Sequence, residues 1–191
     1  MELTGIVVLA VLAVVVVYFI MIYNQLVQVK HNVSKAWANI DVLLKQRHDE
    51  LPKLVETCKQ YMKFEQDTLV KVMEARSHVS DAREQQNIGA LGQAEGELRG
   101  ALGRLFALAE AYPDLKTNET FKHLQARISS LENAIADRRE FYNESVNVNN
   151  VRIEQFPDSI VAALFSFKPM QLLKFASQET ADVDVRQLFQ A

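Results

Sequence analysis

Two pairs of glutamate and histidine have the spacing that a helix needs to present both side chains on one face. Glu74 stands four residues before His78, and Glu119 stands four residues before His123. Each pair offers a carboxylate and an imidazole, which are common ligands of transition metals. Helical bundles with a di-iron centre use Glu-x-x-His instead, together with two further glutamates. Because both histidines flank the apolar stripes of their segments, we interpret them as solvated side chains and keep a metal-dependent bundle enzyme as the alternative.

The single cysteine is the other side chain that could perform chemistry, as a nucleophile. A catalytic thiol needs a histidine and an orienting group near it. Cys58 lies on an apolar stripe between Leu54 and Tyr61, and His31 and His48 are isolated in the sequence. We therefore interpret Cys58 as a small buried hydrophobic side chain. A single cysteine also excludes an intramolecular disulfide.

Composition narrows the function classes further. The net charge of −3 gives no basic excess of the kind that nucleic-acid binding needs. No glycine-rich phosphate loop follows a predicted strand, and the sequence predicts no cofactor. Only 6 glycines and 4 prolines occur among 191 residues. Such a sequence favours long helices over a turn-rich β fold.

The element that begins the chain is an apolar segment of membrane-spanning length. No charged residue occurs from Leu3 to Val29, and residues 5–23 are almost entirely apolar. As a helix these nineteen residues would span about 28 Å, close to the ~30 Å of the hydrocarbon core. Valine favours strands in water, but in lipid the backbone must satisfy its own hydrogen bonds, which favours the helix. Residues 1–23 are therefore predicted to be an N-terminal membrane anchor.

A cleaved signal peptide is the alternative interpretation of this segment. No lysine or arginine precedes the apolar run, the run exceeds the usual ~7–15 residues, and no small-x-small site follows Tyr23. A retained anchor fits these features better. Four Lys or Arg residues lie between Lys30 and Arg47, so the positive-inside rule predicts an external N-terminus and a cytoplasmic domain. An exported domain is the alternative orientation.

Helical periodicity continues beyond the anchor in four amphipathic segments. Leu26, Val33 and Ile40 recur every seven residues on the first one. Four such segments joined by short breaks predict an all-α fold, in which the transmembrane helix continues into a long antiparallel four-helix bundle over residues 24–157. The expected limits are a first helix to near Glu50, a second from Leu51 past Pro52 to Val79, a loop at 87–92, a third helix ending at Tyr112, and a fourth from Thr117 or Asn118 to before Pro157.

The C-terminal part, residues 158–191, carries weaker signals. Residues 160–167 are apolar and predict a short helix that Pro169 closes, packed either on the bundle or on the bilayer surface. Residues 178–191 alternate apolar and polar side chains, and we expect them to be extended or disordered.

Three motifs in this order resemble those of the LemA family. The first extends from Asp41 to Val55, and the second is Ala-Glu-Ala-Tyr-Pro-Asp-Leu-Lys at 109–116. The third begins with Leu-Glu-Asn at 131–133 and ends with Phe-Pro at 156–157. One difference is Asn149, where the family usually has tyrosine. The resemblance covers nearly the whole chain, and it implies a single-pass protein of the bacterial cytoplasmic (inner) membrane that carries an antiparallel bundle. It implies no reaction, and a branch of the family resembles proteins of magnetosome membranes, which suggests membrane-organising roles.

The polar residues of these motifs lie on or beside the predicted core stripes. A charge that is buried must be paired, because an isolated buried charge is too costly. One interpretation is a hydrogen-bonded network that fixes helix register, and the other is a partner or ligand groove between helices. The residues concerned are Arg47, Glu65, Glu110, Glu132, Asn133, Arg139 and Asn143. The loop Tyr112, Pro113 and Asp114 is a second candidate contact, which either docks a partner or caps two helices.

Three functions therefore compete. The favoured hypothesis is a non-enzymatic scaffold or interaction protein, whose partners are the lipid bilayer and further proteins, with oligomers possible. The second hypothesis is a sensor or regulator of envelope state that transmits a signal through the continuous first helix. The third is the metal-dependent bundle enzyme.

Overall fold

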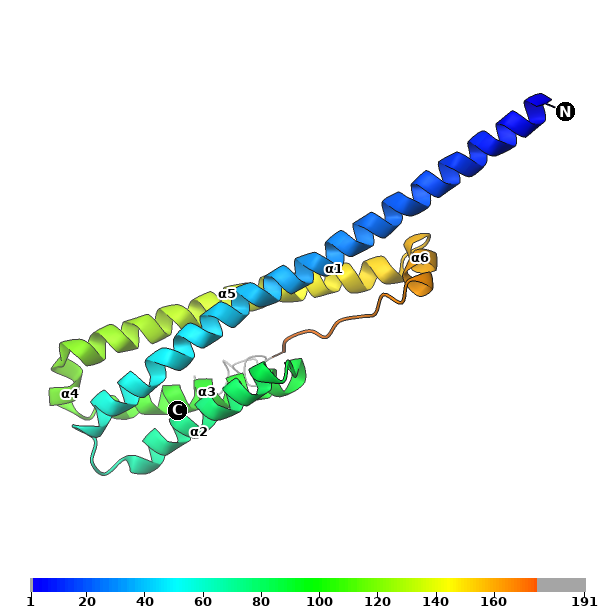
Figure 1. The fold of residues 1–191 in the computed structure, drawn as a ribbon. Helices are drawn as coiled ribbons and strands as arrows, with labels where there is room; N and C mark the ends of the chain where they lie inside the picture. The colour runs from blue at the N-terminus through cyan, green and yellow to red at the C-terminus, as the bar shows by residue number, and fades with distance from the viewer. Residues whose placement is uncertain (1, 175–191) are drawn as a thin grey trace, which may run out of the picture. The chain divides into compact units, whose positions relative to one another are not determined.

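The computed structural model describes residues 2–174, which form helices without any strand (Figure 1). The prediction of an all-α fold is confirmed. Its helices are α1 (Glu2–Lys59), α2 (Gln66–Glu84), α3 (Ile88–Ala109), α4 (Pro113–Thr117), α5 (Glu119–Glu154) and α6 (Asp158–Leu164).

The described chain divides into two compact units, and α1 and α5 contribute residues to both. Among the described residues, the first unit consists of residues 2–43 and 134–172, and the second of Leu44–Asn133 with Leu173 and Lys174. The second unit contains residues of five helices, α1, α2, α3, α4 and α5. The predicted limits 1–23, 24–157 and 158–191 stay a prediction, and residues 178–191 lie outside the described residues.

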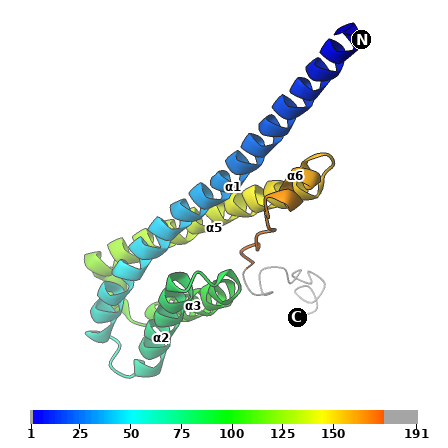
Figure 2. The ribbon, with the colours of Figure 1, turned by 45° about the vertical axis from the view of Figure 1, so that its right-hand side comes forward.

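In the first unit, α1 and α5 lie side by side and antiparallel (Figures 1 and 2). The sevenfold stripe of α1 is buried, as predicted, from Leu26 through Val33 to Ile40. The rings of Trp37 and Tyr142 meet edge to face, with their centroids 5.9 Å apart. Apolar stripes that face each other explain why two long helices pair here without a sheet to support them.

The segment after α6 is held along α5 in the first unit. The side chain of Asn150 donates to the carbonyl of Met170 (2.9 Å) and accepts from its amide (2.8 Å). The hydroxyl of Tyr142 donates to the carbonyl of Gln171 at 3.0 Å. These side chains supply the hydrogen bonds that an extended backbone needs when no strand pairs with it.

The predicted end of the first helix near Glu50 is wrong, because α1 continues through Pro52 to Lys59. A proline inside a helix removes one backbone hydrogen bond and leaves the carbonyl four residues earlier without its donor. That carbonyl belongs to His48, and Nε of Arg76 on α2 donates to it at 2.9 Å. The unit therefore satisfies the orphaned carbonyl with a side chain from another helix, which lets α1 run on and bury Leu54 and Cys58.

The predicted loop at 87–92 is also wrong, because α3 begins at Ile88. The side chain of Asn87 caps this helix by accepting from the amide of Ala90 at 3.0 Å. A side chain added at Gly92 would collide with the carbonyl of Lys174. Gly92 is thus a site of close backbone approach inside a helix, whereas the sequence suggested a helix break.

The start of the fourth long helix agrees with the prediction. Asn118 accepts from the amide of Phe121 at 2.9 Å and so acts as the N-cap of α5. The helix ends at Glu154, before Pro157, and the short apolar helix α6 follows at Asp158–Leu164 where 160–167 was predicted.

Candidate functional site

A buried ionic cluster joins three helices of the second unit. Arg47 projects from α1 and is 1% exposed, whereas α3 supplies Glu95 at 2% and α5 supplies Glu132 at 17%. The guanidinium donates one hydrogen bond to each carboxylate, through Nη2 to Glu95 and through Nη1 to Glu132. Nε of Arg99 lies 3.5 Å from the second carboxylate oxygen of Glu132. One arginine therefore holds two carboxylates from two different helices.

Arg47 occupies a position that would otherwise hold an apolar core residue. On α1 it lies three residues after Leu44 and four before Leu51, and both leucines are buried. Helical spacing of three and four places all of these side chains on the core-facing stripe. The cluster therefore exists because the α1 stripe carries a charge into the core, where other helices must neutralise it.

The electrostatics of the cluster favour a charged guanidinium. Burial opposes the charge on Arg47, but Glu95 and Glu132 outweigh burial and raise the pKa of the guanidinium above its ordinary value. Burial also raises the pKa of the Glu95 carboxyl, and Arg47 offsets only part of that effect. Because Arg47 and Glu95 are almost closed to solvent, a partner protein has no direct access to them, and the geometry is that of an internal tie between helices.

Further polar contacts involve Glu50 and His48, which lie close to Arg47 in the sequence of α1. Glu50 approaches Lys53 at 3.2 Å and Nε of Arg127 at 3.5 Å. His48, which looked isolated in the sequence, receives a hydrogen bond from the guanidinium of Arg76 at Nε2. Partial burial and then the positive charge of Arg76 lower the pKa of His48 below its ordinary value, so the neutral ring is favoured.

The predicted polar residues do not all gather at this cluster. The structure brings Arg47 and Glu132 together, whereas Glu110 is exposed and pairs with Lys116, and Asn133 is exposed. Glu110 and Asn133 therefore lie on the surface and are not part of the buried cluster. The other members are Glu65, half-buried at the start of α2, and Arg139 and Asn143, half-buried on α5 in the first unit.

Glu95 is the residue that sequence reasoning missed. It lies four residues after Leu91 and three before Leu98, and both leucines are fully buried. This spacing marks Glu95 as a core position of α3. A carboxylate at such a position is not expected from the sequence alone, because an isolated buried charge is costly.

The segment Tyr112, Pro113 and Asp114 has the geometry of a helix start. Tyr112 stands at the N-cap position of α4, Pro113 is its first residue, and Asp114 lies in its first turn. Leu115 is buried, whereas Asp114 is exposed. Tyr112 makes no side-chain capping hydrogen bond, and both the capping interpretation and a contact with a partner stay predictions.

The candidate catalytic side chains do not form a site among the described residues. His78 is exposed, and its Nδ1 lies 3.1 Å from Glu97. Glu119 pairs with Lys122, and His123 is exposed. No group of three or more His, Cys, Asp or Glu side chains that could hold a metal occurs in the described part of the chain. Burial raises the pKa of the Cys58 thiol to about 12, so at neutral pH it is protonated and a poor nucleophile.

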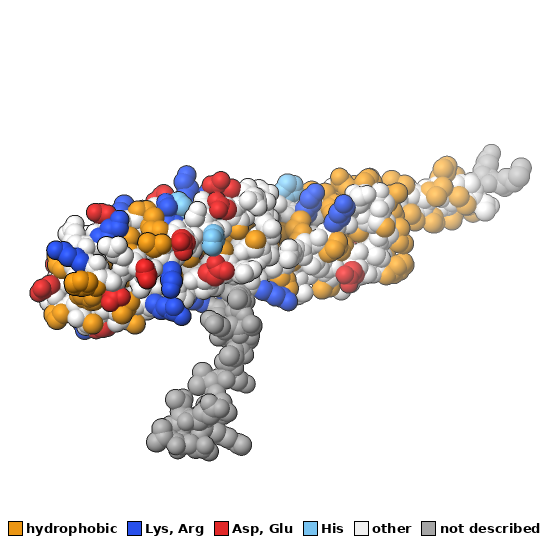
Figure 3. All heavy atoms as spheres, turned by 90° about the horizontal axis from the view of Figure 1, so that it is seen from below, with side chains coloured by type: hydrophobic (Ala, Val, Ile, Leu, Met, Phe, Trp, Pro, Cys, Tyr) orange, Lys and Arg blue, Asp and Glu red, His pale blue; other side chains and the backbone are white. Residues whose placement is uncertain are grey.

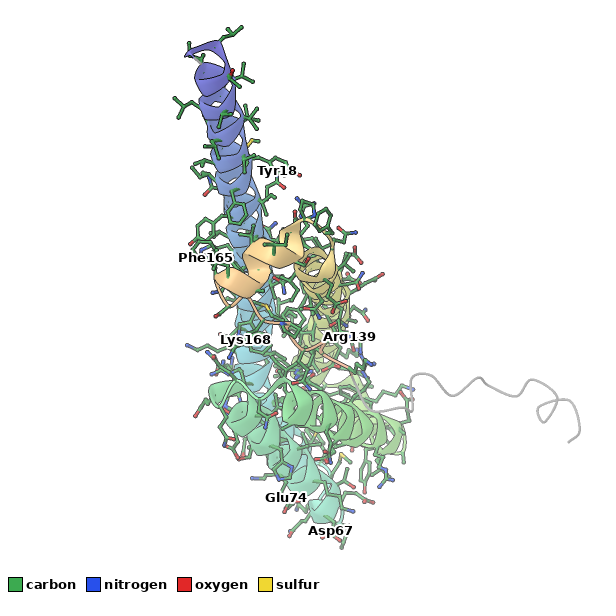
Figure 4. The ribbon with its side chains drawn as sticks, turned by 90° about the vertical axis from the view of Figure 1, so that its right-hand side faces the viewer. Tyr18, Asp67, Glu74, Arg139, Phe165 and Lys168 are labelled. Atoms are coloured by element: carbon green, nitrogen blue, oxygen red, sulfur yellow. The ribbon has the colours of Figure 1, made fainter. Side chains whose placement is uncertain are left out.

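A partly open groove of about 800 Å³ lies between the end of α1 and α2 in the second unit. Its apolar lining includes Met62, Leu69, Val70 and Met73, and lysines and a glutamate stand at its rim. Figure 4 labels Glu74, one of these rim residues, on α2. Methionine side chains adapt to irregular apolar surfaces, which suits a groove that binds another helix.

The first unit exposes a long apolar surface. Every residue from Leu3 to Tyr18 is exposed, and only 6% of the most apolar part of α1 is buried. Figure 3 shows this surface as nearly continuous hydrophobic side chains toward the N-terminus. Within the described residues, α1 is the one helix that is long and apolar enough to cross a membrane.

Comparison with known proteins decides the family. The sequence model of the LemA family matches residues 36–186. The chain belongs to the LemA family. The matched range contains the whole ionic cluster of Arg47, Glu95 and Glu132. The exposed apolar part of α1, from Leu3 to Tyr18, lies entirely before it.

This LemA-family chain is similar to several named proteins. It is similar to the magnetosome protein MamQ 2 of Paramagnetospirillum magneticum, with 26% identity over 208 residues that cover 96% of this chain and 76% of the relative. The MamQ of Magnetospirillum gryphiswaldense is 25% identical, covering 90% and 71%. The protein LemA of Metamycoplasma hominis is 27% identical, covering 93% and 81%.

Proposed function

We propose that this LemA-family chain is a non-enzymatic, single-pass protein of the bacterial cytoplasmic membrane that presents a helical bundle to protein partners. The carrying observation is the exposed apolar part of α1, in which no residue from Leu3 to Tyr23 is charged. Such a surface is strongly unfavourable in water, whereas a bilayer core accepts about 20 apolar residues in helical form. The relatives named for the magnetosome support a role in an assembly with other membrane components.

The absence of turnover is part of this proposal. Support comes from the protonated, buried thiol of Cys58 and from the exposed positions of His78 and His123. Elemental analysis of the purified full-length chain tests it, together with the double variant His78→Ala/His123→Ala. We expect no stoichiometric metal in the purified chain, and we expect cells that carry the double variant to behave like cells that carry the parent chain. Stoichiometric metal that the double variant loses would instead support a metal-dependent enzyme.

Membrane retention is tested with native vesicles. We expect an alkaline carbonate wash to leave the full-length chain in the pellet, and the mature chain to keep residues 3–23. Release into the supernatant, or a mature chain that starts after Tyr23, contradicts the proposal.

Orientation is tested with an impermeant thiol reagent on Glu2→Cys, which precedes the apolar segment, and on Ser34→Cys, at an exposed position after it. With the domain in the cytoplasm, Ser34→Cys reacts only after permeabilisation and Glu2→Cys reacts without it. Buried Cys58 gives little background. The reverse pattern would indicate an exported domain.

The groove beside α2 is the surface that we propose for a protein partner. An amphipathic helix with acidic flanks fits it, because the lining is apolar and Lys59 and Lys63 stand at the rim. A photo-crosslinker at Val70 is expected to capture a defined membrane partner that Met73→Glu abolishes. The matched control is Ser129, an exposed position on α5 of the same unit. Equal capture at both positions, or none at Val70, would exclude the groove.

A second candidate function is a sensor of envelope state, because α1 is one helix from Glu2 to Lys59. A rigid helix can transmit a displacement or rotation of the apolar segment along its length. Insertion of three glycines after Lys30 breaks this continuity without removing either unit. An unchanged phenotype would exclude the sensor and leave the scaffold.

A further inference from the structure

We propose that α6 and the residues after it, through Lys168, form a second membrane element that lies in the headgroup boundary beside the exit of α1. This inference rests on the proposed membrane anchor, because it needs the bilayer that α1 crosses. Its occupant is the phospholipid interface itself, with acyl-chain ends against the apolar side chains and phosphates near the lysines.

The two faces of α6 differ in what covers them. Val161 and Ala162 are buried against Ile22 and Leu26 of α1. The opposite face carries Ile160, Ala163 and Leu164 at positions i, i+3 and i+4, and Leu164 is 67% exposed. The apolar patch continues into Phe165, which is 52% exposed. The single acidic residue of α6, Asp158, is buried and paired with Arg152 at 2.6 Å. The exposed face is therefore apolar and uncharged, as in helices that lie in a membrane interface.

The depth of α6 matches the end of the apolar segment. From Leu3 to Tyr23 the helix rises about 30 Å, which equals the thickness of the hydrocarbon core. The ring of Tyr23 meets the ring of Phe165 with centroids 4.7 Å apart and that of Phe167 at 6.0 Å. A bilayer boundary that lies at Tyr23 therefore also meets Phe165. Tyrosine is enriched at such boundaries, where its ring sits at headgroup level.

Lysine side chains lie beyond the aromatic rings, on the side where the lipid headgroups would be. Figure 4 shows Tyr18, Phe165 and Lys168 in this order, away from the N-terminal end of α1. The ammonium of Lys30 lies 6.0 Å from the centre of the Phe167 ring. Lys30 and Lys168 line one pocket of about 200 Å³ together with Asn149 and Ser166. Two ammonium groups with an amide and a hydroxyl suit the phosphate of an anionic lipid, because lysines near a membrane surface attract anionic headgroups.

Continuity with the apolar segment favours lipid over a protein on this face. The patch shares the Tyr23–Phe165 contact with α1, so its edge is already at the boundary when α1 is inserted. Lysine side chains beyond the boundary reach back toward phosphates while their stems lie along apolar surface. A partner protein on this face would have to displace lipid from it.

The test uses the full-length chain in protein-free vesicles of phosphatidylcholine with phosphatidylglycerol. A fluorophore is attached to Leu164→Cys, to Val11→Cys in the apolar segment, or to Phe141→Cys, an exposed apolar position on α5 of the same unit. Nitroxide lipids labelled at shallow or deep positions then report the depth of each fluorophore. We expect shallow nitroxides to quench the label at position 164 at least about twofold more than the control at 141. Deep nitroxides should quench position 11 most.

The outcomes separate the two proposals. Quenching at 11 with none at 164 overturns the interfacial role of α6 and leaves the anchor standing. Absence of quenching at 11 overturns both. If position 164 is unquenched in vesicles but shielded from thiol reagents in native membranes, a protein covers this face instead.

The lysines are tested with Lys30→Gln/Lys168→Gln in the chain labelled at 164. We expect this double variant to lose quenching in vesicles that contain phosphatidylglycerol, and to match the parent in pure phosphatidylcholine. Lys35→Gln, an exposed lysine on α1, is the control. Equal quenching of parent and double variant in both vesicles would remove the lysines from the proposal.

Discussion

Two regions of this chain reverse the usual arrangement of side chains in opposite ways. The first unit exposes a run of apolar residues from Leu3 to Tyr18 on α1, and the second unit buries the charge of Arg47 in its core. Each arrangement costs several kcal/mol in water unless a partner removes the mismatch. For Arg47 that partner is inside the chain, as Glu95 and Glu132. For the apolar residues the structure offers none, since almost all of that segment is exposed.

This contrast indicates where the function must be sought. The charge of Arg47 is balanced within the chain, and both Arg47 and Glu95 are almost closed to solvent, so the consequences of this cluster are stability and helix register. The apolar surface is incomplete without an external phase, so it defines the environment in which the chain works. Substitutions in each region test whether the charge of Arg47 is neutralised inside the chain and whether the apolar surface needs an external phase.

The largest loss of stability is expected when Arg47 is removed and its buried partner Glu95 remains. Arg47→Met should lower the free energy of unfolding by about 3–5 kcal/mol, because Glu95 then stays buried without its counter-charge. Denaturation of the full-length chain in detergent micelles measures this loss. Adding Glu95→Leu should recover most of it, since a well-packed apolar pair tolerates burial.

The matched control is Glu110→Ala, which removes a surface ion pair with Lys116. It should change the free energy of unfolding by less than about 1 kcal/mol. A cost for Arg47→Met as small as that of Glu110→Ala would show that the cluster contributes nothing to stability. Losses that simply add in the double variant would exclude coupling between Arg47 and Glu95.

The second effect concerns the lipid that we propose to surround the apolar part of α1. A single arginine at the middle of the apolar segment costs about 2.5–3.5 kcal/mol on insertion scales. We therefore expect Val11→Arg to shift the chain from the carbonate-resistant pellet toward the supernatant, whereas Val11→Leu stays in the pellet. Unchanged retention of Val11→Arg would mean that lipid does not surround this part of α1.

The third effect tests how α1 passes a proline. Arg76→Ala leaves the carbonyl of His48 without a donor, which should cost about 1–3 kcal/mol of the free energy of unfolding. Pro52→Ala restores a backbone amide four residues after His48, so it should offset much of this loss in the double variant. Independent, additive effects of the two substitutions would disprove the link between Pro52 and Arg76.

The sequence predicted the features that arise from local periodicity. The stripe of Leu26, Val33 and Ile40 is buried, and Asn118 caps α5. These succeed because side-chain spacing and capping chemistry act over a few residues. Of the candidate polar residues, Arg47 and Glu132 meet because each interrupts or adjoins an apolar stripe.

The features that sequence reasoning missed depend on residues far apart in the chain. Helix α1 continues through Pro52 because Arg76 arrives from another helix. Gly92 lies inside α3 because the backbone of Lys174 approaches it. The spacing of Glu95 on α3 marks a core position, but the partner that neutralises its charge there, Arg47, comes from α1. Local propensity contains none of this information, so the helix limits near Pro52 and Gly92 were placed wrongly.

The smallest effect is expected for the pH dependence of the contact between His48 and Arg76. It tests a second polar contact of α1, close to Arg47 in the sequence. The pKa of His48 is lowered in the folded chain, first by burial and then by Arg76, so between that lowered value and about 6.5 the unfolded chain binds more protons. The stability from this contact is therefore present above about pH 6.5 and is lost as the pH falls through the folded-state pKa.

His48→Gln keeps an acceptor for Arg76 but does not titrate, so its unfolding free energy should fall less steeply between about pH 7 and 5. His31→Gln, at an exposed position on α1, is the control and should keep the parent slope. Identical slopes for the parent and His48→Gln would mean that the Arg76 contact does not depend on a neutral imidazole.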